Sequence, residues 1–473
     1  MKEFELLRST PEKQGVSSGV IAALFQCLDK LEYMKSIIIM RHGRIIYENY
    51  WKPWNKETQG ALWSLSKSFT SCAVGFARAE GLLTLEAPLI GFFPEYRSCV
   101  TDEKMFKVTL QDLLTMRSGH RQCALYSGWS EPAGDWVRGF LSSHLDFEPG
   151  THFTYNTLAT YMLSAVLRRV TGMNVREYLI PRLFEPLEIV PGIWESCPAG
   201  TNCGGYGLHL KPMDIAKFAQ LLLNKGVWNG VQILDPDYLE EAVQPHADNS
   251  VNQHPDWKCG YGYQFWRSRH GFRADGACGQ YAVVLPEEDM AVAVTATMSN
   301  MGQVLDLIWE KLLPYLESGP LPENPGALAL LDSLSSASGL EPLKTAGLAE
   351  KKKWRFVFFP NALEIESALL ESGRKECTLT FRRGCEEEII RAGFGEWRES
   401  RIKLHDRMSH AVASCAAVQG EGLEIKVMYL DEVYRDTWKI EFKENTAIFH
   451  WSTVCSPFRA ALPPLAVREV CSY

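Results

Sequence analysis

Ser64 and Lys67 stand three residues apart at the start of a segment, residues 69–80, that predicts a helix. At this spacing two side chains share one face of a helix, so an amine or ammonium comes next to a hydroxyl. A serine hydroxyl is a weak nucleophile until a neighbouring group takes its proton, and Lys67 is a candidate for that base. The pair therefore suggests nucleophilic catalysis.

The pattern Ser-x-x-Lys is not specific by itself. It recurs at Ser372 with Lys375 and at Ser400 with Lys403, in regions that predict surface turns or strand ends. The assignment of a nucleophile to Ser64 therefore depends on the elements around it and on motifs further along the chain.

Apolar spacing predicts the elements that must hold this pair in place. Helices are expected at 17–31, 109–116, 159–170, 175–183, 212–224 and 304–313. Strands are expected at 36–40 and 44–48, which form a hairpin, and at 263–266, 280–285 and 290–297. Residues 120–150, rich in Gly, Pro, Ser and Trp, predict an irregular stretch. A largely helical segment is thus expected between one hairpin near the start of the sequence and a set of strands at 263–297.

The composition changes after residue 317. Residues 318–350 are rich in Pro, Gly, Ser and Ala and predict a linker, with a short helix near 327–334. Residues 351–473 contain many short strand candidates separated by turns, which is typical of an antiparallel barrel or sandwich. We therefore expect a first domain at 1–317, a linker at 318–350 and a β-rich domain of unknown role at 351–473.

Three motifs follow one another along the first domain. They read Ser64-Leu65-Ser66-Lys67, Phe153-x-Tyr155-Asn156-Thr157, and Ala274-Asp275-Gly276-Ala277 followed by Gly279-Gln280-Tyr281. In their order and spacing they resemble those of the serine β-lactamase, penicillin-binding protein and esterase superfamily, in particular its class C-like members and the 6-aminohexanoate-dimer hydrolases.

The resemblance implies a fold and a set of catalytic residues. The fold is of the α/β (α+β) class, with an antiparallel sheet flanked by helices and an additional all-helical lobe. Ser64 would be the nucleophile, and Lys67 and Tyr155 would handle protons, with the choice of base left open. The backbone N–H groups of Ser64 and Ala277 would form the oxyanion hole.

The same resemblance implies substrate-binding roles for Thr157, Asp275, Gly276 and Gln280. Other interpretations of these residues stay open. Asn156 or Thr157 can also cap the helix that begins at Leu158, and Gln280 can be an ordinary strand residue.

The third motif departs from the family pattern, because Ala274 stands where relatives have a Lys or His. Arg273 could substitute for that cation, although strand neighbours point to opposite faces. The departure weakens β-lactam hydrolysis and favours a small ester or amide as substrate. A β-lactamase or penicillin-binding protein, and a non-catalytic binding protein that keeps the fold, remain the alternatives.

Composition excludes several other classes. The chain has 473 residues and a net charge of −8, which argues against a nucleic-acid or anionic-membrane partner. Its 13 cysteines are scattered, and its histidines lack metal-binding spacing, so we expect reduced thiols, no metal and no cofactor. No signal peptide or membrane-spanning stretch is visible, which predicts a cytoplasmic protein. The sequence leaves the oligomeric state and the substrate undetermined.

Overall fold

The computed structural model describes residues 6–31, 33–125, 128, 130–131, 134–344, 351–404, 407–418, 422–443, 446–454 and 463–472. They form two compact units. The first unit comprises the described residues of Met1–Asn49, Ala61–Ala296 and Asn300–Ser336, and the second those of Tyr50–Gly60, Thr297–Ser299 and Ala337–Tyr473. The second unit therefore takes in two short segments that interrupt the first unit, Tyr50–Gly60 and Thr297–Ser299.

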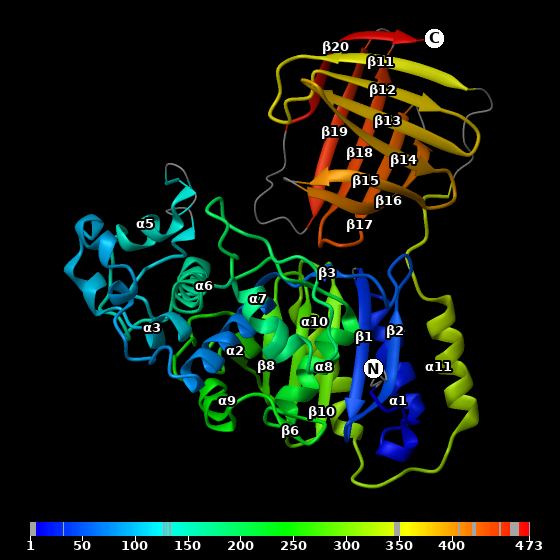
Figure 1. The fold of residues 1–473 in the computed structure, drawn as a ribbon. Helices are drawn as coiled ribbons and strands as arrows, with labels where there is room; N and C mark the ends of the chain where they lie inside the picture. The colour runs from blue at the N-terminus through cyan, green and yellow to red at the C-terminus, as the bar shows by residue number, and fades with distance from the viewer. Residues whose placement is uncertain are drawn as a thin grey trace. The chain divides into compact units, whose positions relative to one another are not determined.

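A six-stranded sheet in the order β2-β1-β10-β9-β8-β7 is the centre of the first unit (Figure 1). The bounds are β1 Met34–Arg41, β2 Arg44–Tyr50, β7 Trp266–Arg267, β8 Phe272–Gly276, β9 Gln280–Leu285 and β10 Met290–Ala296. The short strands elsewhere are β3 Gly60–Ala61, β4 His209–Leu210, β5 Val227–Trp228 and β6 Val231–Gln232. Neighbouring strands run antiparallel from β1 through β10, β9 and β8 to β7.

Helices cover this sheet on both faces. Every residue of β1, β9 and β10 is buried, which a sheet with one open face does not permit. Helix α8 (Pro212–Leu223) packs on β1, β9 and β10, while α1 (Ser18–Leu28) packs on α10 (Gly302–Lys311). Helix α11 (Pro325–Ala337) follows α10.

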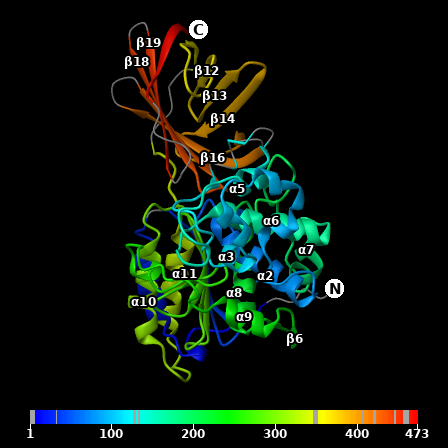
Figure 2. The ribbon, with the colours of Figure 1, turned by 90° about the vertical axis from the view of Figure 1, so that its left-hand side faces the viewer.

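A lobe of helices extends the first unit beside the sheet (Figure 2). Its members are α2 Ser66–Ala79, α3 Leu110–Leu114, α5 Trp136–Leu141, α6 Thr157–Thr171, α7 Val175–Leu179 and α9 Pro236–Ala242. Helix α2 packs on α6, α7 and α9, and α3 and α5 pack on α6. The stacked rings of Phe69 and Phe218, 4.0 Å between centroids, join α2 to α8. Helix α2 is therefore held between the lobe and the sheet.

The expected fold class is confirmed in this unit, with two local corrections. Helix α5 lies inside the stretch that was expected to be irregular. The strand expected at 263–266 reduces to Trp266–Arg267 because Gln264 has a φ of 64° and its amide donates to the carbonyls of Leu113 and Leu114. These bonds tie the segment to α3 in place of a strand partner.

The C-terminal part of the second unit is a closed antiparallel barrel and not a sandwich. Nine strands follow one another in the order β14-β13-β12-β11-β20-β19-β18-β17-β16, and a parallel pairing of Gly393 in β14 with Ser414 in β16 closes the ring. The remaining strand, β15, pairs with β16. The bounds are β11 Lys352–Phe358, β12 Ser367–Ser372, β13 Glu376–Arg383, β14 Glu386–Gly393, β15 Arg398–Leu404, β16 Arg407–Val418, β17 Gly422–Tyr429, β18 Arg435–Lys443, β19 Thr446–Val454 and β20 Leu465–Ser472.

Aromatic side chains fill the barrel. Phe356 lies with its ring centroid 4.9 Å from that of Phe449, and Phe381 lies 4.5 Å from Trp438. All four residues are buried. Sequence patterns did not predict β15, which is rich in charged residues, or β20.

The segment Tyr50–Gly60 is bonded to the C-terminal part of its own unit. The Trp54 indole N–H donates to the carbonyl of Leu430 at 3.2 Å, and the Leu340 N–H donates to the carbonyl of Lys52 at 2.7 Å. Trp51 and Trp54 are both buried. The barrel unit therefore includes a segment that precedes α2 in the sequence.

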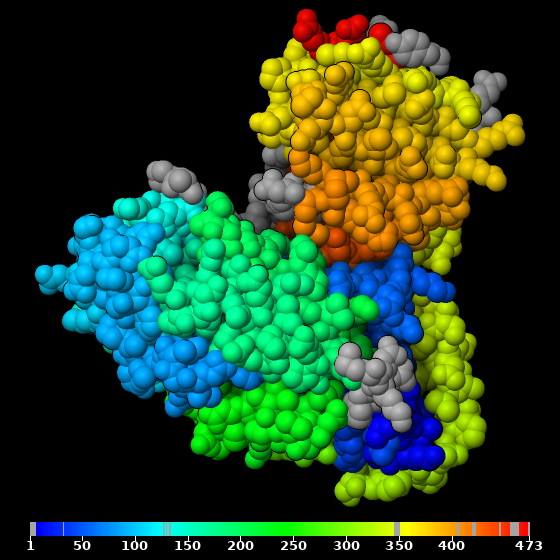
Figure 3. Space-filling view, in the orientation of Figure 1, coloured from blue at the N-terminus to red at the C-terminus, as the bar shows by residue number. Residues whose placement is uncertain are grey.

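The space-filling view shows that the green part of the chain, which includes α7 and α9, forms much of one face of the first unit (Figure 3). Among the helices that the structure describes, none combines the length and the apolar character needed to cross a membrane.

Candidate active site

Ser64 lies in a short 3₁₀ turn, Trp63–Leu65, directly before α2. The preceding residue, Trp63, has a φ of 51°, which is rarely adopted by large side chains and is common at functional sites. Ser64 is partly exposed, whereas α2 is buried over most of its length. Its hydroxyl and backbone N–H therefore stand at the start of a buried helix.

Lys67 is buried, with 1% of its surface exposed, and its Nζ contacts three oxygens. These are the hydroxyl of Ser64 at 3.1 Å, the hydroxyl of Thr157 at 3.2 Å and the carbonyl of Gly205 at 2.7 Å. The expected approach of Lys67 to Ser64 is thus present in the structure.

The charge state of Lys67 follows from its burial. Loss of solvent lowers the pKa of its ammonium from 10.5 to about 7, against a smaller opposing effect of Asp275. In the amine form Nζ has two hydrogens and one lone pair. The Gly205 carbonyl can only accept a hydrogen, so the lone pair is left for a hydroxyl, and Ser64 offers one at 3.1 Å. This geometry suits proton transfer from Ser64 to Lys67.

Tyr155 lies next to the same pair. Its ring centroid is 4.9 Å from the Nζ of Lys67, and its ring stacks on Trp266 at 5.3 Å. Burial raises the pKa of the Tyr155 phenol far above its usual value, and the neighbouring Ser64 hydroxyl counteracts this only in part. At neutral pH the phenol therefore keeps its proton, while the Lys67 amine is partly free.

The third motif forms the corner between β8 and β9. A Cβ on Gly276 would lie 2.1 Å from the carbonyl oxygen of Leu62, so only glycine lets the strand approach the turn that carries Ser64. Gln280 is buried, and its amide donates to the carbonyls of Ala277 at 3.2 Å and Ala296 at 2.7 Å. Gln280 therefore restrains Ala277 through its carbonyl, while the N–H of Ala277, in the preceding peptide, is the expected oxyanion donor.

Thr157 and Asn156 have separate roles at the start of α6. The Asn156 side chain caps the helix by accepting from the N–H of Leu158 at 3.1 Å. Thr157 is the first residue of the helix and accepts from Lys67. The structure thus places Thr157 against the lysine, and Asn156 is the cap.

Asp275 lies on β8, one residue before the corner. Its Oδ2 accepts from the Nε of Arg273 at 2.9 Å. Burial raises the pKa of Asp275 to about 6, although Arg273 acts to lower it. The carboxylate lies within electrostatic range of both Lys67 and Tyr155. The expected site residues on three separate segments are therefore neighbours in the fold.

Gly205 is a site residue that sequence patterns did not identify. A Cβ there would lie 2.8 Å from the Thr157 side chain, so glycine is required for its carbonyl to reach Lys67. The only feature of the sequence at this position is the glycine-rich run at 204–207, which predicts a loop.

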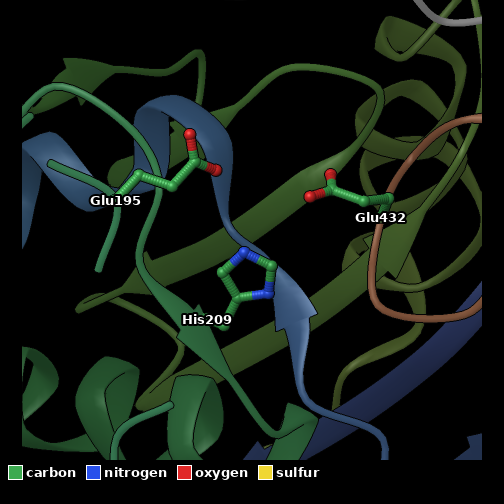
Figure 4. Close-up of side chains that lie close together, drawn as sticks. All are labelled: Glu195, His209 and Glu432. Carbon is green, nitrogen blue, oxygen red and sulfur yellow. The ribbon is translucent and has the colours of Figure 1, made fainter. Parts of the chain in front are cut away.

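The loop that carries Gly205 is closed by a short ladder of backbone bonds. Glu195 donates its N–H to Gly207 and accepts from Cys203, and the His209 N–H donates to Ile193. The side chains of Glu195 and His209 lie close together, with a carboxylate oxygen and an imidazole nitrogen within 4.8 Å (Figure 4). Glu432, also labelled there, belongs to the second unit.

A second acidic group, His254, Asp256 and Asp306, is also compact. Arg269 forms ion pairs with both carboxylates, and the Trp309 indole N–H donates to Asp256 at 3.0 Å. Asp256 is thus neutralised by an arginine, and its backbone carbonyl accepts from Arg273 at 3.0 Å. Through this bond to Arg273, the group helps to hold β8 in place.

The other two Ser-x-x-Lys patterns lie in the second unit. Ser400 is on β15, where its hydroxyl accepts from the N–H of Arg391 at 2.9 Å, and Lys403 pairs with Glu386 at 2.7 Å. Residues three apart on a strand point to opposite faces, so this serine and lysine do not meet. Ser372 is on β12.

Comparisons with known proteins show the family of the chain. A family model described as Beta-lactamase matches residues 32–311. Esterase EstB of Burkholderia gladioli is 29% identical over 173 residues, which is 32% of this chain and 44% of that protein.

Two solved structures show the likeness of the fold. A candidate 6-aminohexanoate-dimer hydrolase from Bacillus anthracis superposes with a TM-score of 0.55 and 22% identity, over 68% of this chain and 89% of that one. An octameric penicillin-binding protein homologue from Pyrococcus abyssi has a TM-score of 0.51 and 17% identity, over 88% of this chain and 98% of that one. Because the family model covers more than half of the residues, the chain belongs to the beta-lactamase family, as its three motifs predict.

Proposed function

We propose that the protein is a serine hydrolase that cleaves a small ester or amide through an acyl-enzyme on Ser64. The observation that carries this proposal is the burial of Lys67, whose amine contacts the Ser64 hydroxyl at 3.1 Å. Membership of the beta-lactamase family and the partial likeness to an esterase support the same reaction type.

In the acylation step, Lys67 accepts the proton of the Ser64 hydroxyl as the oxygen attacks the carbonyl carbon. The carbonyl electrons move to oxygen, and the N–H groups of Ser64 and Ala277 donate to this oxyanion. Each preorganised donor of this kind is worth about 3 kcal/mol to the transition state. Gln280 donates to the carbonyl of Ala277, in the peptide that follows this N–H, and so supports the role by restraining the corner residue.

The tetrahedral intermediate then expels the leaving group. Tyr155, whose raised pKa keeps it protonated, donates its proton to the leaving oxygen or nitrogen, and the Lys67 ammonium returns a proton to Tyr155. Lys67 is thereby an amine again. It can take the proton of a water molecule that attacks the acyl-enzyme, and Ser64 recovers its own proton when the product acid leaves.

Turnover of a phenyl ester tests the proposal. We expect Ser64→Ala to lose at least about a thousandfold in kcat, as nucleophile removal does in other serine hydrolases. Ser400→Ala is the matched control, since it removes the serine of the same pattern in the barrel. Unchanged turnover in Ser64→Ala would refute the proposed function.

A further inference from the structure

Arg273 and Asp275 form an ion pair on one strand beside the reacting serine. They are two residues apart on β8, so their side chains lie on the same face. The Arg273 Nε donates to Oδ2 of Asp275 at 2.9 Å. Which ligands can bind to this pair depends on whether the guanidinium or the carboxylate is accessible.

The guanidinium of Arg273 is enclosed. Its Nη1 donates to the Ser268 hydroxyl at 2.7 Å and to the backbone carbonyls of Asp256 and Arg267. Its Cζ lies 4.5 Å from the ring centroid of Trp257. Its Nη2 is buried and finds no acceptor among the residues that the structure describes. Arg273 therefore serves as a counter-ion inside the unit and presents no surface to a ligand.

Asp275 is also buried, but it is the more accessible member of the pair. Its side chain is 6% exposed, compared with 0% for Arg273, and it accepts from Arg273 and from Trp257, which leaves further acceptor positions on its two oxygens. It directly precedes the Gly276–Ala277 corner and lies within electrostatic range of Lys67 and Tyr155. An ionised carboxylate only accepts hydrogen bonds, so its partner must be a donor. A carboxylate in a ligand would face this anion and could not reach the enclosed guanidinium.

We propose that Asp275 determines substrate specificity by accepting hydrogen bonds from a protonated primary amine on the acyl or leaving group. The inference rests on the proposed hydrolase function and names the substrate class of that site. A charge-assisted bond in a site with little solvent is stronger than one in water. Above about pH 6 Asp275 is ionised, while an alkyl amine stays protonated to about pH 10, so both charges coexist at neutral pH.

Three phenyl esters of equal chain length test the inference at pH 7.5. They are phenyl hexanoate, phenyl 6-aminohexanoate and monophenyl adipate, whose acyl groups end in a methyl, an ammonium and a carboxylate, and whose chains are too long for rapid closure of a five-membered ring that would release phenol without the enzyme. For the wild-type protein we expect kcat/KM to be highest for the amine ester, by at least about tenfold over the neutral ester, and lowest for the adipate. Equal values, or a preference for adipate, would overturn the inference.

Asp275→Asn removes the charge while keeping the shape of the side chain. We expect the ratio of kcat/KM for the amine ester to that for the neutral ester to fall at least about tenfold. The control is Glu287→Gln, which removes one exposed negative charge from the turn between β9 and β10 and should keep the wild-type ratio. An unchanged ratio in Asp275→Asn would contradict the assignment.

A binding measurement on the wild-type protein decides the matter even if a variant fails to fold or no ester is turned over. Butylammonium, butanol and butyrate are compared for the rise in Tm that each produces at equal concentration and ionic strength. We expect the largest rise with butylammonium. Stabilisation by butyrate, or no difference between the three compounds, would reject an amine site. If butylammonium stabilises the protein but no ester is turned over in a Ser64-dependent way, the proposed hydrolase function is refuted and the amine site is not.

Discussion

At the scale of the residue, the chemistry of the site depends on the burial of one lysine. The Nζ of Lys67 is surrounded by the hydroxyls of Ser64 and Thr157 and the carbonyl of Gly205, with 1% of the residue exposed. None of these three partners is an anion, so the ammonium is only weakly stabilised. The same environment that would make a charged lysine unfavourable makes the amine available as a base.

The pH dependence of kcat/KM follows from the lowered pKa of Lys67. Below about pH 7 the ammonium predominates and cannot accept a proton, so kcat/KM for a neutral ester should fall as the pH is lowered. Above about pH 7 the amine predominates, and the rate should reach a plateau. Stopped-flow or plate assays between pH 5 and 9 measure this profile, with circular dichroism at each pH to confirm the fold. A rise with its midpoint above pH 9 would contradict the role of Lys67.

Thr157 is expected to position the Lys67 amine. Thr157→Val removes one of its three oxygen partners, and we expect kcat to fall about tenfold, the effect of one lost hydrogen bond. Because a hydroxyl that accepts from Nζ favours the ammonium, its loss should also move the midpoint of the pH profile to lower pH. Thr157→Ser keeps the hydroxyl and should restore both quantities. A Val variant with the wild-type pH profile would show that Thr157 only fills space.

At the scale of the element, the contact between the β8–β9 corner and the turn before α2 brings the proposed catalytic groups together. Gly276 allows this contact, since any Cβ there meets the Leu62 carbonyl. Gln280 restrains the corner by donating to the carbonyl of Ala277. The two proposed oxyanion donors thus belong to two elements whose close approach requires one glycine.

Gly276→Ala tests this contact. The added methyl must displace backbone, so we expect a loss of about 1–3 kcal/mol in the free energy of unfolding, together with a lower kcat. Gly91→Ala is the matched control, because a Cβ there would meet no atom within 4 Å. Urea titration gives the free energies. A Gly276→Ala protein as stable and active as the control would argue against close packing at the corner.

Sequence patterns predicted the elements whose signals are local. The helix expected at 17–31 is α1, which Ser17 caps, and the helix expected at 159–170 lies within α6, which ends before Gly172. The carbonyl of Gly205 could not be predicted in this way, because a backbone group has no residue-type signal and its loop lies far from Lys67 in sequence. The ion pair of Arg273 with Asp275 was also not predicted. Only the side-chain direction of Arg273 relative to its neighbour Ala274 was considered.

At the scale of the whole molecule, the two units are interleaved in sequence. The segment Tyr50–Gly60, between β2 and the turn of Ser64, belongs to the barrel unit, whereas residues 318–336 belong to the first unit. The boundaries expected from composition, at residues 317 and 350, remain a prediction, and the first compact unit extends to Ser336.

Truncation after Ser336 tests the consequence of this interleaving. It removes Leu340 and Leu430, which bond the segment of Lys52 and Trp54, and it would uncover the buried Trp51 and Trp54. We expect the fragment to aggregate or to melt at least about 5 °C below the full chain, consistent with the loss of about 1 kcal/mol or more. A soluble fragment with the full-length Tm would show that the first unit is independent of the barrel.

The nucleophilic role of Ser64 is the central claim, and covalent labelling tests it most directly. The folded full-length protein is treated with a fluorophosphonate, digested, and the modified peptide is identified by mass spectrometry. The account predicts modification of Ser64, at a rate that falls below about pH 7 with the protonation of Lys67. Labelling of a different residue, or no labelling of the folded protein, would contradict it.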